Sequence, residues 1–83
     1  MIYQVYVIEN SERRRYIGLS SDVSVRLKQH NSGESTYTKN KGPWSLVWTS
    51  RDLTLSEARK LELKMKKQKG GSGLQTLMDA YGS

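Results

Sequence analysis

A chain of 83 residues without cysteine is long enough for one small domain, and it excludes disulfide bonds and thiolate metal sites. Its 14 lysine and arginine residues against 8 acidic residues give a net charge of +6, which favours a polyanionic partner such as nucleic acid, although basic charge can also serve solubility alone. Because no signal peptide and no stretch of roughly 20 apolar residues are present, we expect a cytoplasmic protein without a membrane partner.

The first two predicted elements are strands that form an antiparallel hairpin. Residues 2–8 (IYQVYVI) are rich in β-branched and aromatic side chains, which favour a strand. Polar residues 9–12 break this pattern, and residues 14–19 (RRYIGL) resume it. The short connection predicts that the two strands pair directly.

The length of the turn suggests a register for this hairpin. If the turn centres on Ser11, Tyr6 lies opposite Tyr16, and Gln4 lies opposite Gly18. Opposed residues share a face, so both tyrosines would point the same way beside a bare glycine. Taken alone, these residues fit two core tyrosines and a bulge glycine as well as they fit a functional pair.

The next predicted element is a helix over residues 22–31 (DVSVRLKQHN), which Gly33 would end. Arg26 and His30 are four residues apart, so they lie on one face and could act on one ligand group. Lys28 points outward from the same helix. The structural alternatives are a hydrogen-bonded, half-buried histidine and an arginine at the surface.

A basic loop and the third strand follow this helix. Residues 32–43 form the predicted loop, and residues 44–50 (WSLVWTS) form the strand. Trp44 and Trp48 could stack on bases, but core packing is the preferred interpretation. A basic loop with an aromatic side chain suits a nucleic-acid backbone. The loop residues predicted to bind nucleic acid are Tyr37, Lys39 and Lys41.

The longest predicted helix spans residues 54–69 and opens with a capping box completed by Glu57. Glu62 falls within the apolar stripe of this helix, where a carboxylate is costly unless it meets a cation, a metal or hydrogen-bond donors. An ion pair with a buried arginine such as Arg26 is the structural alternative to a functional role. Lys66 belongs to a lysine cluster at the end of the helix, which adds to the basic face.

The C-terminal residues predict a joint and a short amphipathic helix. Residues 70–73 (GGSG) favour a flexible joint, and residues 74–81 place apolar side chains on one helical face. We expect this helix to pack on the domain or on a partner. The whole chain, 1–83, is therefore predicted to be one domain with its core in residues 2–69.

These motifs, in this order, resemble the GIY-YIG nuclease family. Val5–Tyr6 stands at the last two positions of the first motif, with Gln4 in place of its glycine, and Tyr16–Ile17–Gly18 matches the second motif in full. Residues 22–31 are similar to the arginine helix of the family, and residues 57–64 to the helix with its metal-binding glutamate. The pattern is most similar to small stand-alone bacterial members, which are related to the N-terminal domain of an excinuclease and to structure-specific endonucleases. The asparagine that many members carry after the glutamate is missing.

The resemblance implies a fold and a set of roles. The fold is an α+β arrangement, a three-stranded antiparallel sheet flanked by helices in the order β-β-α-β-α-(α). Tyr6 and Tyr16 would orient or deprotonate the attacking water, and Arg26 would hold the scissile phosphate. His30 would serve as base or proton relay. Glu62 would bind one Mg²⁺ or Mn²⁺ ion, because magnesium retains most of its waters and needs few protein ligands.

The implied function is metal-dependent hydrolysis of phosphodiester bonds in DNA, in a structure-selective form within DNA repair or recombination. One alternative is a nucleic-acid-binding module without intrinsic nuclease activity that acts with a partner protein. Another is a protein-interaction module that uses the two tryptophans and the C-terminal helix. The residues predicted to contact nucleic acid around the catalytic set are Lys28, Tyr37, Lys39, Lys41 and Lys66.

Overall fold

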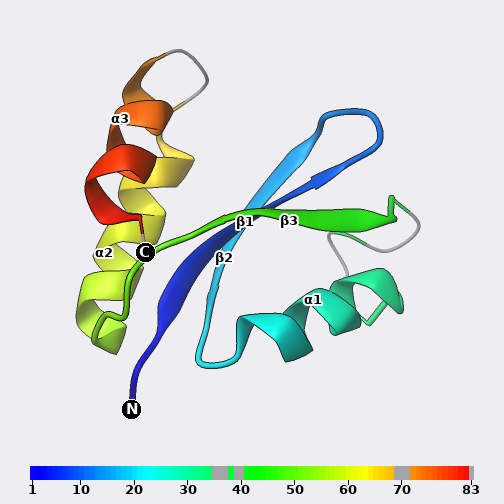
Figure 1. Ribbon diagram of the computed structural model, residues 1–83, viewed down its shortest axis with the longest axis horizontal. Coiled ribbons are helices and arrows are strands. Elements are labelled where there is room, and N and C mark those ends of the chain that lie inside the picture. The colour runs from blue at the N-terminus through cyan, green and yellow to red at the C-terminus, as the bar shows by residue number, and fades with distance from the viewer. Residues whose placement is uncertain (35–37, 39–40, 69–71, 83) are drawn as a thin grey trace.

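The structure, a computed structural model, describes residues 1–34, 38, 41–68 and 72–82. It is a three-stranded antiparallel sheet with three helices, which confirms the predicted fold class and order of elements. The strand order is β2-β1-β3, so β1 lies in the centre of the sheet (Figure 1). The elements are β1 (Gln4–Asn10), β2 (Arg15–Ser20), α1 (Val23–Asn31), β3 (Trp44–Thr49), α2 (Leu55–Lys66) and α3 (Ser72–Tyr81).

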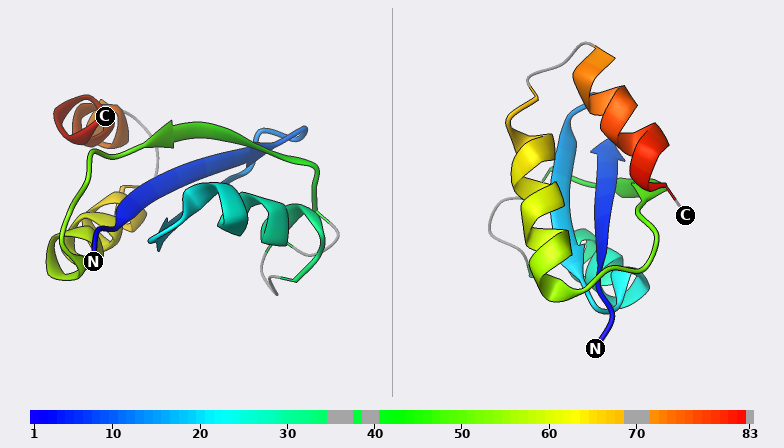
Figure 2. Two further views of the ribbon diagram at one scale, coloured as in Figure 1. Left: turned by 60° about the horizontal axis from the view of Figure 1, so that its bottom comes forward. Right: turned by 90° about the vertical axis from the view of Figure 1, so that its left-hand side faces the viewer.

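The side chains of β1 divide the core into two halves, because successive residues of a strand point to opposite faces. Val5 and Val7 pack against buried residues of α2 and α3. Tyr6 and Ile8 pack on the other face, against residues of α1. Figure 2 shows α2 and α3 side by side over one face of the sheet, with α1 on the opposite side. Alternation along the sequence predicts Val5 and Val7 on one side of this strand and Tyr6 and Ile8 on the other, and the structure confirms this division.

The register of the β1–β2 hairpin differs from the predicted one by two residues. Tyr6 lies opposite Gly18 rather than opposite Tyr16, and Gln4 lies opposite Ser20 rather than opposite Gly18. The predicted pairing was therefore wrong. A shift by two residues keeps every side chain on its face, so both tyrosines still point toward the same side of the sheet.

The turn between β1 and β2 explains this register. The side-chain oxygen of Asn10 accepts hydrogen bonds from the backbone N–H groups of Glu12 and Arg14, at 3.0 and 2.9 Å. This side chain fixes a three-residue turn centred on Glu12 instead of Ser11. Arg13 adopts a φ of 63°, the left-handed conformation that closes such turns.

The helices α1 and α2 both begin with a side-chain N-cap. Asp22 is the N-cap of α1 and accepts a hydrogen bond from the backbone of Val25, and Gly33 follows the helix with a φ of 84°. Thr54 and Glu57 form the predicted capping box of α2. The helix α2 ends at Lys66, three residues earlier than predicted, because a hydrogen bond from the Gln68 N–H group to the Met65 carbonyl tightens its last turn.

The helix α3 packs on the domain, and it begins two residues earlier than predicted. Ser72 and Gly73 of the predicted joint are helical, while the rest of the joint lies outside the described residues. The apolar face of α3 joins the core beside α2. Trp48 donates a hydrogen bond to the backbone oxygen of Met78, and Trp44 is buried in the other half of the core. Core packing of both tryptophans is therefore confirmed.

No helix within the described ranges is both long enough and apolar enough to cross a membrane.

Candidate active site

The side chain of Tyr6 reaches across β2 because the opposed residue is glycine. A Cβ atom at Gly18 would lie 2.6 Å from the Tyr6 hydroxyl and 2.7 Å from the ring carbon that bears it. Real side chains do not approach so closely, so the bare backbone of Gly18 is the space in which the Tyr6 phenol lies. The YIG glycine thus positions a tyrosine of the neighbouring strand.

Tyr6 and His30 form a buried hydrogen-bonded pair. The Tyr6 hydroxyl lies 2.7 Å from His30 Nε2, and both residues are 1% exposed. His30 Nδ1 lies 2.7 Å from the hydroxyl oxygen of Thr38, which is also buried. Both ring nitrogens therefore have a partner, and the imidazole is fixed in place between a strand of the sheet and the segment after α1.

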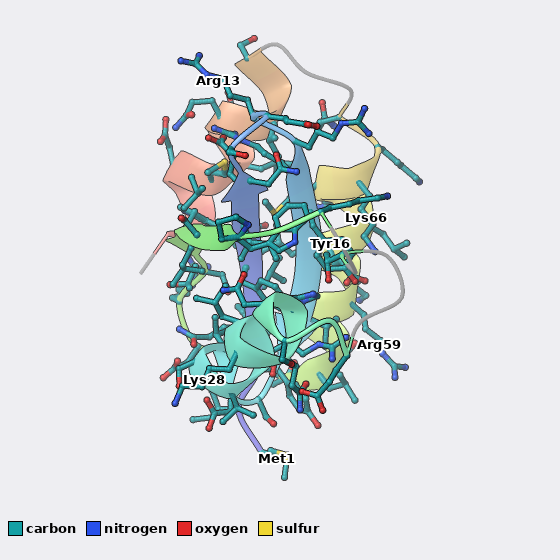
Figure 3. The ribbon with its side chains drawn as sticks, turned by 90° about the vertical axis from the view of Figure 1, so that its right-hand side faces the viewer. Met1, Arg13, Tyr16, Lys28, Arg59 and Lys66 are labelled. Atoms are coloured by element: carbon teal, nitrogen blue, oxygen red, sulfur yellow. The ribbon has the colours of Figure 1, made fainter. Side chains whose placement is uncertain are left out.

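Tyr16 completes a cluster of three rings on the α1 side of the sheet. Its ring centroid lies 4.9 Å from that of His30 and 6.4 Å from that of Tyr6. Tyr16 is half-buried, whereas the other two rings are enclosed. The cluster therefore reaches the surface through Tyr16, which Figure 3 shows on the face of β2 beside α1.

The surroundings of Tyr6 keep its hydroxyl protonated. Burial raises the pKa of Tyr6 to about 12, with a smaller contribution from Tyr16. A hydrogen bond from Arg26 and the charge of its guanidinium act in the opposite direction, and the negative charge of Glu62 adds to the increase in this pKa. Tyr16, Arg26 and Glu62 come from three different elements, and each of them influences the pKa of Tyr6.

Burial also lowers the pKa of His30 below its ordinary value of 6.5, and the positive charge of Arg26 lowers it further. His30 is therefore neutral at pH 7, and one of its two ring nitrogens is unprotonated. This state lets one ring nitrogen accept a proton while the other donates a hydrogen bond.

The stability of the protein should consequently depend on pH through its single histidine. The imidazole of His30 binds a proton more readily in the unfolded chain than in the folded one. The contribution of neutral His30 to the free energy of unfolding is therefore complete above pH 6.5 and is lost as pH falls toward the lowered pKa. We expect the free energy of unfolding to fall by at most about 1.4 kcal/mol per pH unit in this window. Urea unfolding between pH 8 and pH 5.5 would measure it, and an equal slope in a His30→Gln variant would contradict the assignment.

Arg26 lies at the border of the site rather than in the core. It is half-buried, and its Nη1 atom donates a hydrogen bond of 2.9 Å to the side-chain oxygen of Gln29. The positive charge of Arg26 lowers the pKa values of both Tyr6 and His30. A guanidinium at this border is available to an anionic group that approaches Tyr16.

Glu62 lies at the edge of the apolar stripe of α2, and its partner is not the one that the sequence suggested. Its side chain is 19% exposed and forms an ion pair of 3.6 Å with Lys66, one helical turn further along. The predicted structural alternative was an ion pair with Arg26. Glu57, another acidic residue of α2, is engaged in the capping box, where hydrogen bonds from Thr54 lower the pKa of its carboxyl.

A metal ion bound by Glu62 would have few acidic or histidine ligands among the described residues. In the described part of the chain, no group of three or more histidine or acidic side chains could hold a metal ion. A single carboxylate whose charge acts on the Tyr6 phenol agrees with a hard cation that keeps most of its own waters.

The residues predicted to bind nucleic acid divide into three groups. Lys41 and Lys66 are exposed, and Lys66 lies beside Tyr16 (Figure 3). Lys28 is exposed on the other flank of α1, away from Tyr16. The predictions for Tyr37 and Lys39 lie outside the described residues.

A shallow pocket of about 420 Å³ adjoins the site between β2 and the end of α2. Tyr16 forms one side of it, so the pocket is continuous with the three rings. Basic and amide side chains form the rim, and apolar side chains contribute the rest. The lining residues are Arg15, Tyr16, Ile17, Met65, Lys66 and Gln68.

Sequence reasoning missed two polar residues that support the site. Thr38 holds His30 Nδ1, but a loop rich in serine and threonine gives no signal for which hydroxyl does so. Asn31 donates to and accepts from the backbone of Trp44, which ties the end of α1 to the start of β3. Only its position directly after His30 could have suggested a role.

Comparison with known proteins gives a family. The model of the family described as the GIY-YIG catalytic domain matches residues 2–75, nearly the whole chain. The matched region contains every residue of the candidate site. It also extends beyond the predicted core, into the first residues of α3.

Several relatives carry the name UPF0213 protein, which specifies no reaction. The one from Syntrophus aciditrophicus is 35% identical over 75 residues, covering 88% of this chain and 86% of that protein. One from Halobacterium salinarum is 36% identical over 66 residues, covering 78% of this chain and 86% of that protein. The solution NMR structure of a UPF0213 protein from Bacillus halodurans matches with a TM-score of 0.58 and 30% identity, covering 100% of this chain and 88% of that one.

Proposed function

Because the chain belongs to the GIY-YIG catalytic domain family, we propose that it is a metal-dependent endonuclease that hydrolyses phosphodiester bonds in DNA. Structure-selective cleavage in DNA repair or recombination is the form of this activity that we propose. The observation that carries the proposal is the buried Tyr6–His30 pair beside Tyr16, within the electrostatic reach of Arg26 and Glu62. A purely structural core does not require a buried tyrosine–histidine pair together with the charges of Arg26 and Glu62.

The proposed mechanism begins with the attacking water. Tyr16 reaches the surface and orients this water, while Tyr6 and His30 accept its proton. With Nδ1 protonated and donating to Thr38, the unprotonated Nε2 atom accepts the proton of Tyr6 as Tyr6 takes the proton of the water. This relay avoids a free tyrosinate, which the raised pKa of Tyr6 disfavours.

Arg26 and Glu62 supply the charges that the phosphodiester requires. The Arg26 guanidinium would bind the non-bridging oxygens of the scissile phosphate, where negative charge increases in the transition state. Glu62 would hold one Mg²⁺ or Mn²⁺ ion. When bound there, such an ion stabilises the charge on the leaving oxygen.

A second candidate function is a nucleic-acid-binding module without nuclease activity. The ion pair between Glu62 and Lys66 favours it, because this pair already satisfies the carboxylate that would hold the metal. Such a module would use the same basic surface and would act with a partner protein. It predicts binding that weakens steeply with salt but no cleavage.

A pair of glutamine variants in α2 tests the proposed nuclease. Glu62→Gln should reduce cleavage of branched, nicked or duplex DNA by about 100-fold or more, because one group that stabilises transition-state charge is lost. Glu57→Gln removes the same charge from the same helix at a capping position and should retain most of the activity. Gel assays with Mg²⁺ and with Mn²⁺ would measure both rates.

Three outcomes of this assay are informative. Cleavage that persists in Glu62→Gln at the wild-type rate would point to a contaminating nuclease or to another metal ligand. Equal losses in both variants would show that charge or helix stability, rather than the site, is responsible. DNA binding without cleavage in either metal would support the binding module instead.

A further inference from the structure

Three consecutive arginines run from the turn between β1 and β2 into the start of β2, and Arg13 has a backbone conformation that is unfavourable for arginine. Arg13 has a φ of 63°, a value that glycine and asparagine adopt more easily than arginine does. The side chain of Asn10 imposes this turn through two backbone hydrogen bonds, and it also donates to the carbonyl of Lys41 at 3.0 Å. The arginine is therefore held in a strained position by a rigid anchor, which suggests a role for its side chain.

This turn lies at the same end of the molecule as the basic end of α2. Figure 3 shows Arg13 at the tip of the hairpin, beyond Tyr16 and Lys66. The pocket beside Tyr16 joins the two regions, because Arg15 and Lys66 both line it. We call this region the hairpin surface, and its exposed residues are Arg13, Arg14, Arg15, Lys66 and Lys67.

The hairpin surface retains positive charge after its internal ion pairs are formed. Arg15 pairs with Glu9 at 3.0 Å, and Arg14 lies 3.8 Å from Glu12. Among the described residues, neither Arg13 nor Lys67 has an ion-pair partner within 4.0 Å. Exposed ion pairs of this kind are weak, so they do not prevent the paired cations from meeting a stronger anion.

The geometry points to the phosphate backbone of DNA as the partner of this surface, and this inference rests on the proposed nuclease function. Arg13 lies in the turn three residues before Tyr16, so the backbone separates the two by at most about 10 Å. One strand of duplex DNA carries a phosphate about every 3.4 Å of its axis, so this distance corresponds to about three phosphates beyond the site. We propose that the hairpin surface binds these phosphates and holds the DNA on the side of Tyr16 opposite to Lys28.

The experiment measures binding of a labelled duplex in EDTA over a series of salt concentrations, so that no cleavage is needed. Arg13→Gly and Lys67→Gln should each reduce the slope of log affinity against log salt by about 0.9, the value for one phosphate contact. Lys60→Gln is the matched control, because Lys60 lines a different groove on the outer side of α2, and its slope should stay unchanged.

Arg13→Gly also separates binding from folding. Glycine adopts a φ of 63° without strain, so this variant should melt at the same temperature as the wild type or higher while it binds DNA more weakly. Unchanged slopes in both Arg13→Gly and Lys67→Gln would overturn the inference, as would an equal loss in Lys60→Gln. If the protein cuts DNA but the salt slopes of both variants are unchanged, the nuclease proposal stands and the inference about the hairpin surface fails. If the slopes fall as expected but the protein never cuts DNA, the hairpin surface stands and the nuclease proposal fails.

Discussion

Tyr6→Phe is expected to reduce the cleavage rate by about 100-fold to 10,000-fold, the range for loss of a positioned proton-transfer group. The loss should appear in kcat rather than in KM, because Tyr6 is 1% exposed and offers little contact area to DNA. The variant should also lose about 1–3 kcal/mol of stability, since His30 Nε2 would be left buried without its partner. Single-turnover cleavage and urea unfolding would measure the two effects.

Tyr3→Phe is the matched control for this substitution. Tyr3 lies just before β1 and packs on the opposite half of the core, beside α2 and α3. Removal of the Tyr3 hydroxyl should leave kcat close to that of the wild type. A Tyr6→Phe protein with normal kcat would remove Tyr6 from the proton relay and leave it a structural role only.

Gly18→Ala is expected to disrupt the site almost as strongly, although it adds only one methyl group. The new Cβ atom would lie 2.6 Å from the Tyr6 hydroxyl, so the ring must move away from His30. Overpacking of this kind costs about 1–3 kcal/mol. A displacement of about 1 Å in a catalytic group can reduce a rate by about 100-fold. We therefore expect folded but nearly inactive protein, measured by thermal unfolding and by cleavage.

A double-mutant cycle identifies the cause of the Gly18→Ala effect. Tyr6→Leu removes the ring atoms that the new methyl group would meet. In that background Gly18→Ala should cost far less stability than in the wild type, because the two residues are directly opposed. Equal costs in both backgrounds would show that the methyl group disturbs the strand itself rather than Tyr6.

The order of elements and the faces of β1 could be predicted from the sequence because they follow from short periodic patterns. Alternating side chains placed Tyr6 and Tyr16 on one face, and a shift of two residues in register left that conclusion intact. The register itself depends on the side chain of Asn10, which folds back on the turn. A count of turn residues contains no information about that hydrogen bond.

Only those residues of the site that a local sequence pattern marks could be predicted. Arg26 and His30 stand one helical turn apart, and Glu62 interrupts an apolar pattern, so the sequence identifies all three as candidate site residues. The partner of Glu62 proved to be Lys66, because a residue one turn away on the same helix competes with one on another element. Thr38 meets His30 only through the path of the chain after α1, and no pattern in the loop encodes that path.

The central position of β1 has a consequence for the motion of the site. This strand is hydrogen-bonded on both sides, and its residues from Val5 to Ile8 are at most 1% exposed. Its amide protons should therefore exchange with solvent only when the whole domain unfolds. Tyr6 thus projects from the slowest-opening part of the molecule, while Arg26 and Glu62 stand on helices at the two flanks of the sheet. Any adjustment of the site to different substrates must then come from movement of α1 and α2, while Tyr6 keeps its position.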